Sequence, residues 1–223
     1  MNGRLSESTR VEAFSDGVLA IVITLLVLDL KAPAQEGRLL VGLAEQWPAY
    51  VTYLASFAYV GVIWVNHHQL FSRVAKVDLG FLWRNLVLLL ATSVLPFPTA
   101  VVGDAFQHGD RGDQHVALVL YSLVGMTTVG AWLLLYHFLA HNPRLLRAPD
   151  HARFFAGERR RSWVGILAYA LVALAASTHP VAGLVVSCLL PIFYAVTSDG
   201  IRSRRLREPP GETQLDRPPG SQR

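Results

Sequence analysis

Asp16 lies where a charged and hydroxylated stretch, residues 10–17, meets a long apolar run, residues 18–28. An unpaired carboxylate costs about 2.5–3.5 kcal/mol at the centre of a membrane helix and less near its end. The Asp16 side chain can accept hydrogen bonds from an indole, an imidazole or a guanidinium group. We therefore predict that polar partners from other parts of the chain surround it.

The candidate partners are polar residues at the ends of other apolar runs. They are Arg10, Trp64, His67, Arg84 and Asn85. We predict that they form a structural network that fixes the first helix against the second and third. In the alternative interpretation, these residues act independently at the level of the lipid headgroups, where Trp and Arg are common.

Histidine spacing suggests a second chemistry, metal binding. His137 and His141 are spaced i, i+4, and His67 and His68 are adjacent. One alternative function is therefore a membrane-embedded, metal-dependent oxidoreductase, and another is a proton-coupled transporter that uses Asp16 and His67. Two histidines with no carboxylate beside them fall short of the ligand set of catalytic iron or zinc. We predict interfacial histidines, no catalytic residue, no metal site and no enzymatic activity.

The composition indicates the elements that must position these residues. Of 223 residues, 52% are hydrophobic and only 16% are charged, against about 25% charged in soluble domains. The single cysteine, Cys188, lies in an apolar run and is expected to be a small core side chain. Six apolar segments approach the roughly 20 residues that a spanning helix needs: Phe14–Leu30, Pro48–Leu70, Phe81–Gly103, Val116–Leu139, Trp163–Thr178 and Pro180–Thr197.

The basic residues predict the orientation of these six spans. Of the 20 Lys and Arg residues, only Lys31, Arg38 and Arg111 lie in the first, third and fifth connections. Positive residues stay on the cytoplasmic side, so both termini are predicted to be cytoplasmic. The net charge of +4 then reflects contact with anionic membrane lipids, and no nucleic-acid partner is expected. A cleaved signal peptide ending at residues 32–34 is the alternative for the first segment, and the acidic residues before that segment argue against it.

We predict three regions along the chain: a loose cytoplasmic tail over 1–9, a six-helix transmembrane domain over 10–200, and a basic, disordered cytoplasmic tail over 201–223. The fifth and sixth segments meet at residues 178–180, so a hairpin that does not fully cross is the alternative there. The longest internal loop is expected over 140–162. We also expect a short amphipathic piece around Leu39–Leu43 and a break at Pro96-Phe97-Pro98.

The first segment offers a candidate pore face. At 100° per residue, one stripe collects Gly17, Ile21, Thr24 and Leu28. Thr24 is the only hydroxyl of the apolar run; its side chain either lines a polar path or bonds back to the carbonyl of Ala20. The run is apolar all round, so periodicity alone does not choose between these interpretations. No TVGYG-type filter is present, because Ala131 and Trp132 follow residues 128–130 where a filter would continue.

The first segment also carries a family resemblance. Arg10, Phe14, Ser15, Asp16 and Gly17 form an Arg-x-x-x-Phe-Ser-Asp-Gly motif that resembles the signature of the transmembrane protein 175 family of potassium channels. Two later stretches agree with that family: residues 64–68, and Asn85 leading to residues 96–99. The resemblance covers about residues 10–200 and matches a bacterial homologue with one six-helix repeat.

The resemblance implies an all-α membrane protein that assembles as a homotetramer around a central pore lined by the first helix. By position, Ile21 and Leu28 would be constriction residues and Thr24 a hydroxyl layer between them. Phe14 and Ser15 would join Asp16 in the structural network. The implied function is passive conduction of monovalent cations, with potassium favoured over sodium, in a bacterial-type cell membrane and without a cofactor. The implied partners are further copies of the chain, membrane lipids and permeant cations.

Overall fold

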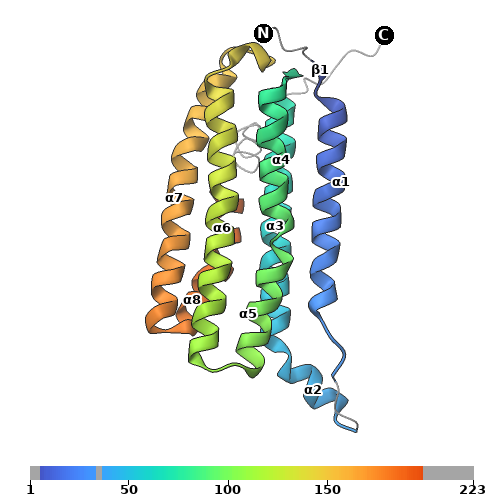
Figure 1. Cartoon of the computed structure of the whole chain (residues 1–223), viewed down its shortest axis with the longest axis vertical. Helices are drawn as coiled ribbons and strands as arrows, with labels where there is room; N and C mark the ends of the chain where they lie inside the picture. Colours follow the sequence, from blue (N-terminus) through green and yellow to red (C-terminus); the bar gives the residue numbers. More distant parts are fainter. Residues whose placement is uncertain (1–5, 34–36, 198–223) are drawn as a thin grey trace, which may run out of the picture.

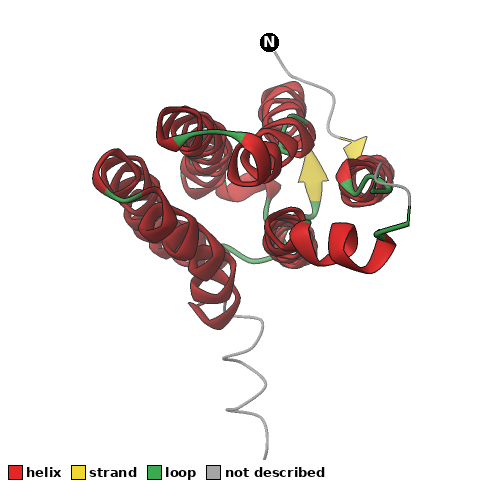
Figure 2. Cartoon of the chain, turned by 90° about the horizontal axis from the view of Figure 1, so that it is seen from below, coloured by secondary structure: helices red, strands yellow, loops and turns green. Residues whose placement is uncertain are grey.

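The structure is a computed structural model of the chain. It describes residues 6–33 and 37–197. The fold is a bundle of long helices that lie side by side along one axis, with two very short strands at one end (Figure 1). Seen from one end, the helices form a single group without a layer of sheet (Figure 2). The α-helices are α1 (Thr9–Leu25), α2 (Leu39–Glu45), α3 (Trp47–Arg73), α4 (Leu79–Ser93), α5 (Pro96–His108), α6 (Arg111–Ala140), α7 (His151–Thr178) and α8 (Pro180–Thr197).

All six predicted apolar segments are helical, which confirms the all-α fold. Within the described residues, five helical stretches are long and apolar enough to cross a membrane: Thr9–Asp29, Trp47–Arg73, Leu79–His108, Arg111–Ala140 and His151–Thr178. The sixth, Pro180–Val196, is a shorter apolar helix. Its seventeen residues at 1.5 Å per residue reach about 26 Å, close to the roughly 30 Å of a hydrocarbon core.

The predicted break in the third segment falls just before Pro96. Helix α4 ends at Ser93 and α5 begins at Pro96. Proline has no N–H to donate into the preceding turn, and its ring crowds the carbonyl four residues earlier. The short piece expected around Leu39–Leu43 is α2, which ends two residues later at Glu45.

Aspartate side chains begin two of the long helices. The Asp78 carboxylate accepts a hydrogen bond from the backbone N–H of Phe81 at 2.9 Å, which caps α4. Asp110 and Asp113 form a reciprocal capping box at the start of α6. Each satisfies backbone donors that have no partner inside the helix, so these two starts are defined by local sequence.

The structure corrects the predicted loop over 140–162. Helix α7 begins at His151 and continues through the basic residues 159–161. The physical reason for the earlier start is that this stretch has a buried helical face. Its members are Phe155, Glu158, Ser162 and Gly165. The connection between α6 and α7 is therefore short, and contains a 3₁₀ turn, η2 (Pro143–Leu145).

The amino-terminal tail is also more ordered than the prediction of a loose segment over 1–9. Strand β1 (Ser6–Glu7) pairs antiparallel with β2 (Lys76–Val77). The Ser8 hydroxyl donates to the carbonyl of Val74 at 3.3 Å. These contacts attach the start of α1 to the α3–α4 connection. Residues 1–5, and the predicted carboxyl-terminal tail over 201–223, lie outside the described residues.

The interior is packed by large side chains set against small ones. Tyr169 on α7 is 1% exposed and lies against Gly125 on α6, where an added Cβ would overlap its ring. The hydroxyl of Tyr194 on α8 lies in the same way against Gly165. Small residues let membrane helices approach closely, and here they bring α6, α7 and α8 together on one side of the bundle.

Candidate functional site

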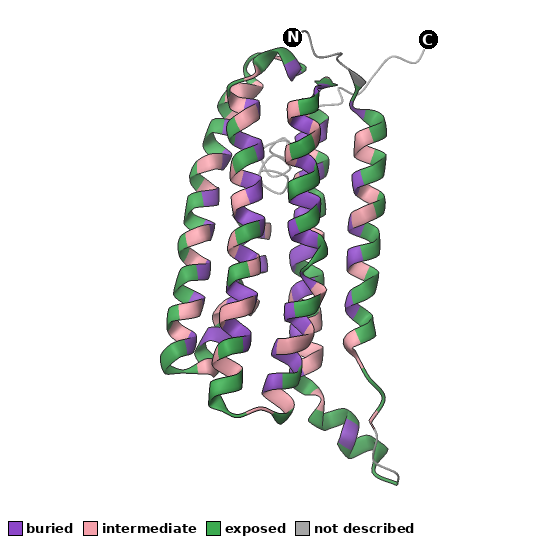
Figure 3. Cartoon of the chain, viewed as in Figure 1, coloured by how far each residue is buried: buried purple, intermediate pink, exposed green. Residues whose placement is uncertain are grey.

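Helix α1 buries one face and exposes the other, although its sequence is apolar all round (Figure 3). The buried face consists of Ser15, Leu19, Val22 and, in the following turn, Leu26. The predicted stripe of Gly17, Ile21, Thr24 and Leu28 lies on the exposed face, where Ile21 is 60% and Leu28 is 69% exposed. Packing therefore separates two faces that hydropathy could not distinguish.

The last residue of the stripe does not follow the assumed α-helical spacing. Helix α1 ends at Leu25, and the chain continues as a 3₁₀ turn, η1 (Leu26–Asp29). A 3₁₀ helix turns by about 120° per residue, so the extrapolation at 100° per residue is wrong at Leu28. The side chain is nevertheless exposed.

The Thr24 hydroxyl bonds to its own helix and is also exposed. It donates to the backbone carbonyl of Ile21 at 2.8 Å, whereas the predicted alternative partner was Ala20. A hydroxyl has one hydrogen to donate and two lone pairs that accept. The hydrogen bond to Ile21 therefore leaves the Thr24 oxygen able to face a cation, and the two interpretations of Thr24 are compatible.

Asp16 is held to α3 by one side-chain hydrogen bond. The indole Nε1 of Trp64 donates to the Asp16 carboxylate at 3.2 Å. The bond is partly open to the surroundings, since Trp64 is 47% exposed. It joins the start of the apolar part of α1 to the part of α3 that lies beside it.

A second connection, fully buried, joins α1 to α4 and α3. The Asn85 side-chain amide donates to the Ser15 hydroxyl at 2.9 Å, and the Asn85 carbonyl oxygen lies 3.1 Å from Nε2 of His67. The Ser15 hydroxyl in turn donates to the backbone carbonyl of Val11 at 2.8 Å. Ser15, Asn85 and His67 are all at most 1% exposed.

The directions of these bonds assign the histidine tautomer. The Asn85 carbonyl oxygen can only accept, so Nε2 of His67 carries the hydrogen. Nδ1 of His67 is then an acceptor, and it is buried with no hydrogen-bond partner among the described residues. Because Asn85 uses both ends of its amide, it fixes the position of α1 relative to α3 and α4 at the same time.

Three predicted members of the network lie elsewhere. Arg10 is exposed and makes no hydrogen bond or ion pair with the described residues. Phe14 is 57% exposed, on the outer face of α1. Arg84 donates to the carbonyl of Gly80 at 2.7 Å and lies over the ring of Phe138, 4.2 Å from its centroid. Asp16 therefore has an indole partner, and neither arginine pairs with it.

Sequence reasoning missed a further contact between α1 and α3. The carboxylate of Glu12 lies 3.4 Å from Nδ1 of His68, and the His68 ring stacks on Trp64 with centroids 6.2 Å apart. Glu12 and Asp16 are one helical turn apart, as are Trp64 and His68. That matched i, i+4 spacing is the signal that could have identified the pair.

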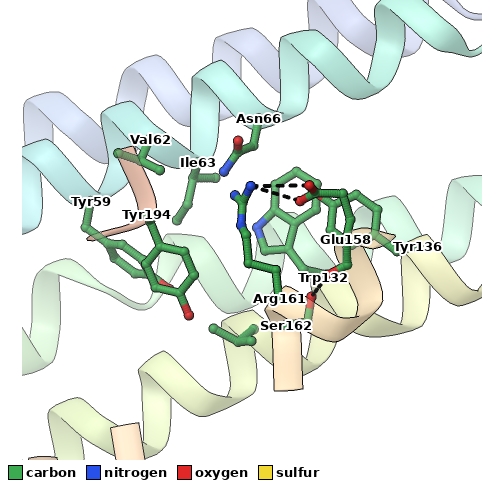
Figure 4. Close-up of a pocket in the computed structure, with 11 residues that line it drawn as sticks. Tyr59, Val62, Ile63, Asn66, Trp132, Tyr136, Glu158, Arg161, Ser162 and Tyr194 are labelled. Atoms are coloured by element: carbon green, nitrogen blue, oxygen red, sulfur yellow. Dashed lines mark hydrogen bonds and ion pairs between the residues drawn. The ribbon is translucent and has the colours of Figure 1, made fainter. Parts of the chain in front are cut away.

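A second missed feature is an ion pair between a buried Glu158 and a partly buried Arg161, in a small pocket (Figure 4). Arg161 bonds both carboxylate oxygens of Glu158, at 3.3 and 3.1 Å. The cavity measures about 30 Å³, enough to hold water. Side chains of α3, α6, α7 and α8 line it, among them Tyr59, Asn66, Trp132 and Tyr194.

The spaced histidines do not form a metal centre with other ligands. The rings of His137 and His141 face each other with centroids 4.3 Å apart. In the described ranges, 6–33 and 37–197, no group of three or more His, Cys, Asp or Glu side chains could hold a metal ion.

Comparisons with known proteins place this arrangement in a family. The family model described as the endosomal/lysosomal potassium channel TMEM175 matches residues 10–96. A potassium channel of Streptomyces collinus is 39% identical over 208 residues, covering 92% of this chain and 100% of the relative. The endosomal/lysosomal proton channel TMEM175 of Mus musculus is 30% identical over 180 residues, covering 74% of this chain and 36% of the mouse protein.

The fold agrees with these sequence matches. The crystal structure of a lysosomal potassium-selective channel TMEM175 homologue from Chamaesiphon minutus superposes with a TM-score of 0.73 at 31% identity. The match covers 85% of this chain and 96% of that one. On these grounds, the chain belongs to the TMEM175 family.

Proposed function

We propose that this chain forms a passive channel for monovalent cations that favours potassium over sodium. The chain is an integral membrane protein of the TMEM175 family, and its Streptomyces collinus relative, which it covers completely, is named a potassium channel. The observation that carries the proposal is the exposed face of α1. Ile21, Thr24 and Leu28 all lie on this face, while the buried face packs on α3 and α4.

One chain presents one such helix, so a pore needs several copies. We propose a homotetramer in which the four α1 helices surround a central axis. Ile21 and Leu28 then form apolar rings that narrow the pore, and Thr24 contributes hydroxyl oxygens between them. An apolar ring offers an ion no oxygen to replace its hydration water, so it raises the barrier to permeation.

The two hydrogen-bonded connections from α1, one partly exposed and one buried, have a supporting role in this proposal. They hold α1 in a fixed rotation, which determines whether the stripe faces the pore. The members joined by hydrogen bonds are Ser15, Asp16, Trp64, His67 and Asn85. The channel domain spans about residues 10–200, with tails over 1–9 and 201–223. The distribution of basic residues supports an orientation with both termini cytoplasmic in a bacterial-type cell membrane.

Membership in a family of ion channels argues against the metal-dependent oxidoreductase, and the proposed channel needs no cofactor beyond the ions it conducts. A proton-permeable channel is a second candidate, because the mouse relative is named a proton channel. A proton-coupled transporter differs from both, since its cation flux would depend on a proton gradient.

Flux measurements on purified protein in liposomes test the proposal. We expect potassium flux down its gradient at equal pH on both sides, with a smaller sodium flux under the same conditions. A potassium flux that stops when the proton gradient is removed would contradict a passive channel. A dye that reports internal pH, with potassium absent, measures the proton permeability separately.

A further inference from the structure

Four basic or titratable side chains meet on the surface of three helices, at the end of the bundle that carries the two short strands. They are Arg84 on α4, His137 and His141 on α6, and Arg159 on α7. His137 and His141 are exposed. The rings of His137 and His141 have centroids 4.3 Å apart, and Arg84 lies over the ring of Phe138, the residue that follows His137. Arg159 and Arg84 both act electrostatically on His137. The three helices therefore bring two arginines together with two imidazoles that become positive only when protonated, and an anion among them would offset the repulsion between the arginines.

Neighbouring groups fix the positions of the hydrogen-bond donors in this basic cluster. Nδ1 of His141 lies 2.8 Å from the carbonyl of His137, so Nδ1 donates there, and Nε2 becomes a second donor when the ring is protonated. The Arg84 guanidinium lies over the ring of Phe138 and donates one N–H to the carbonyl of Gly80. A guanidinium has five N–H donors and matches phosphate geometry, so Arg84 retains donors for an anion.

Helix-end chemistry explains only part of this cluster. Positive side chains are favourable near the carboxyl end of a helix, where they bond the last carbonyls. That accounts for His141 at the end of α6. It does not account for Arg84 and Arg159, which reach the same place from two other helices.

An exposed apolar stripe continues from the cluster toward the middle of α6. Leu134 is one turn from His137 on the same face and is 56% exposed, and Leu123 farther along is 53% exposed. Trp83, beside Arg84, is 62% exposed, and tryptophan is typical of the membrane interface. A basic head region joined to an apolar stripe has the chemistry of a phospholipid.

We propose that the basic cluster of Arg84, His137, His141 and Arg159 binds the phosphate headgroup of an anionic phospholipid in the inner leaflet. The acyl chains lie along the Leu134 side of α6. This inference requires the chain to sit in a membrane with this end inward, and it goes beyond ion conduction. It holds whether or not the pore passes potassium.

Native mass spectrometry of the purified protein tests the proposal, with phosphatidylglycerol and phosphatidylcholine as probes. We expect severalfold more phosphatidylglycerol retained than phosphatidylcholine. A protonated imidazole donates from both ring nitrogens, so retention should rise when the pH is lowered. The phosphodiester of phosphatidylglycerol keeps its negative charge at mildly acidic pH.

Two variants distinguish lipid binding at the cluster from a general effect of positive charge on the protein surface. His137→Gln with His141→Gln should abolish the rise at low pH, and adding Arg84→Gln should remove the preference for phosphatidylglycerol. Arg147→Gln, an exposed arginine on the α6–α7 connection, is the matched control and should change neither. An unchanged preference in the triple variant would overturn the site. Displacement of the lipid by millimolar inorganic phosphate would overturn the lipid as its ligand.

Discussion

The side-chain amide of Asn85 on α4 donates a hydrogen bond to the hydroxyl of Ser15 on α1 across 2.9 Å, in a site where both side chains are at most 1% exposed. Its oxygen accepts from His67 on α3. One amide therefore connects the proposed pore helix to both helices behind it. Buried polar groups that lose their partner cost about 1–3 kcal/mol each, so this amide should matter to stability and to α1 rotation.

Asn85→Ala should destabilise the protein more than Ser15→Ala. The first change strands the His67 donor and opens a cavity, whereas the second strands only the Asn85 amide. We expect Ser15→Ala to cost about 1–3 kcal/mol and Asn85→Ala to cost more, measured as the loss of thermal stability in detergent. The double variant should cost less than the sum, because both changes break the same bond. Additive losses would show that the two residues act separately.

Trp64→Phe should have a smaller effect, because it removes the indole donor to Asp16 and keeps an aromatic ring. The bond is partly exposed, so its loss should cost about 0.5–1.5 kcal/mol. Asp16→Ala leaves the Trp64 donor without its acceptor and should lower the stability of the assembled protein, while Asp16→Asn keeps an acceptor and should cost less. Size-exclusion chromatography after heating measures all three. Equal stability of Asp16→Ala and wild type would remove this bond from the account of α1.

The purified protein should be a multimer with a protein mass near four times the 24.6 kDa of one chain. The physical reason is that one chain exposes one pore-facing stripe and cannot enclose an ion path by itself. Light scattering with a separate detergent correction measures the protein mass. A monomer that conducts potassium in liposomes would contradict the central pore.

Ile21→Asn should increase cation flux. A ring of isoleucines resists wetting, and an amide in its place supplies oxygen to a passing ion. The matched control is Leu167→Asn on α7, because Leu167 is 63% exposed and Ile21 is 60% exposed. Only the change on α1 should raise the single-channel conductance. If Ile21→Asn and Leu28→Asn both leave conductance unchanged, the stripe does not face the pore.

Thr24→Val should reduce the preference for potassium over sodium while leaving assembly intact. Valine has a similar shape but no oxygen, and hydroxyl oxygens can replace part of the hydration shell of a cation. Thr24→Ser keeps the oxygen and should preserve the preference. Reversal potentials under bi-ionic conditions measure both variants. An unshifted reversal potential in a well-assembled Thr24→Val channel would assign the hydroxyl to its backbone bond with Ile21 alone.

The sequence alone determined which six apolar segments are helical. Hydropathy and length depend on composition over about 20 residues, so they predicted six apolar segments that are all helical. Proline at residue 96 and aspartates at 78 and 110 act through neighbouring backbone groups, so local sequence also defines those helix ends. The motif from Arg10 to Gly17 was enough to indicate the family.

Only the tertiary structure decided which polar groups meet. Asp16 had five candidate partners, and only Trp64 bonds to it, because pairing depends on the rotation and depth of separate helices. Arg84 lies near Asn85 in sequence but turns toward Phe138 on α6. The 3₁₀ turn at Leu26–Asp29 and the partly buried ion pair of Glu158 and Arg161 likewise follow from packing. Local sequence fixes an element, whereas contacts between elements fix the face that each one presents.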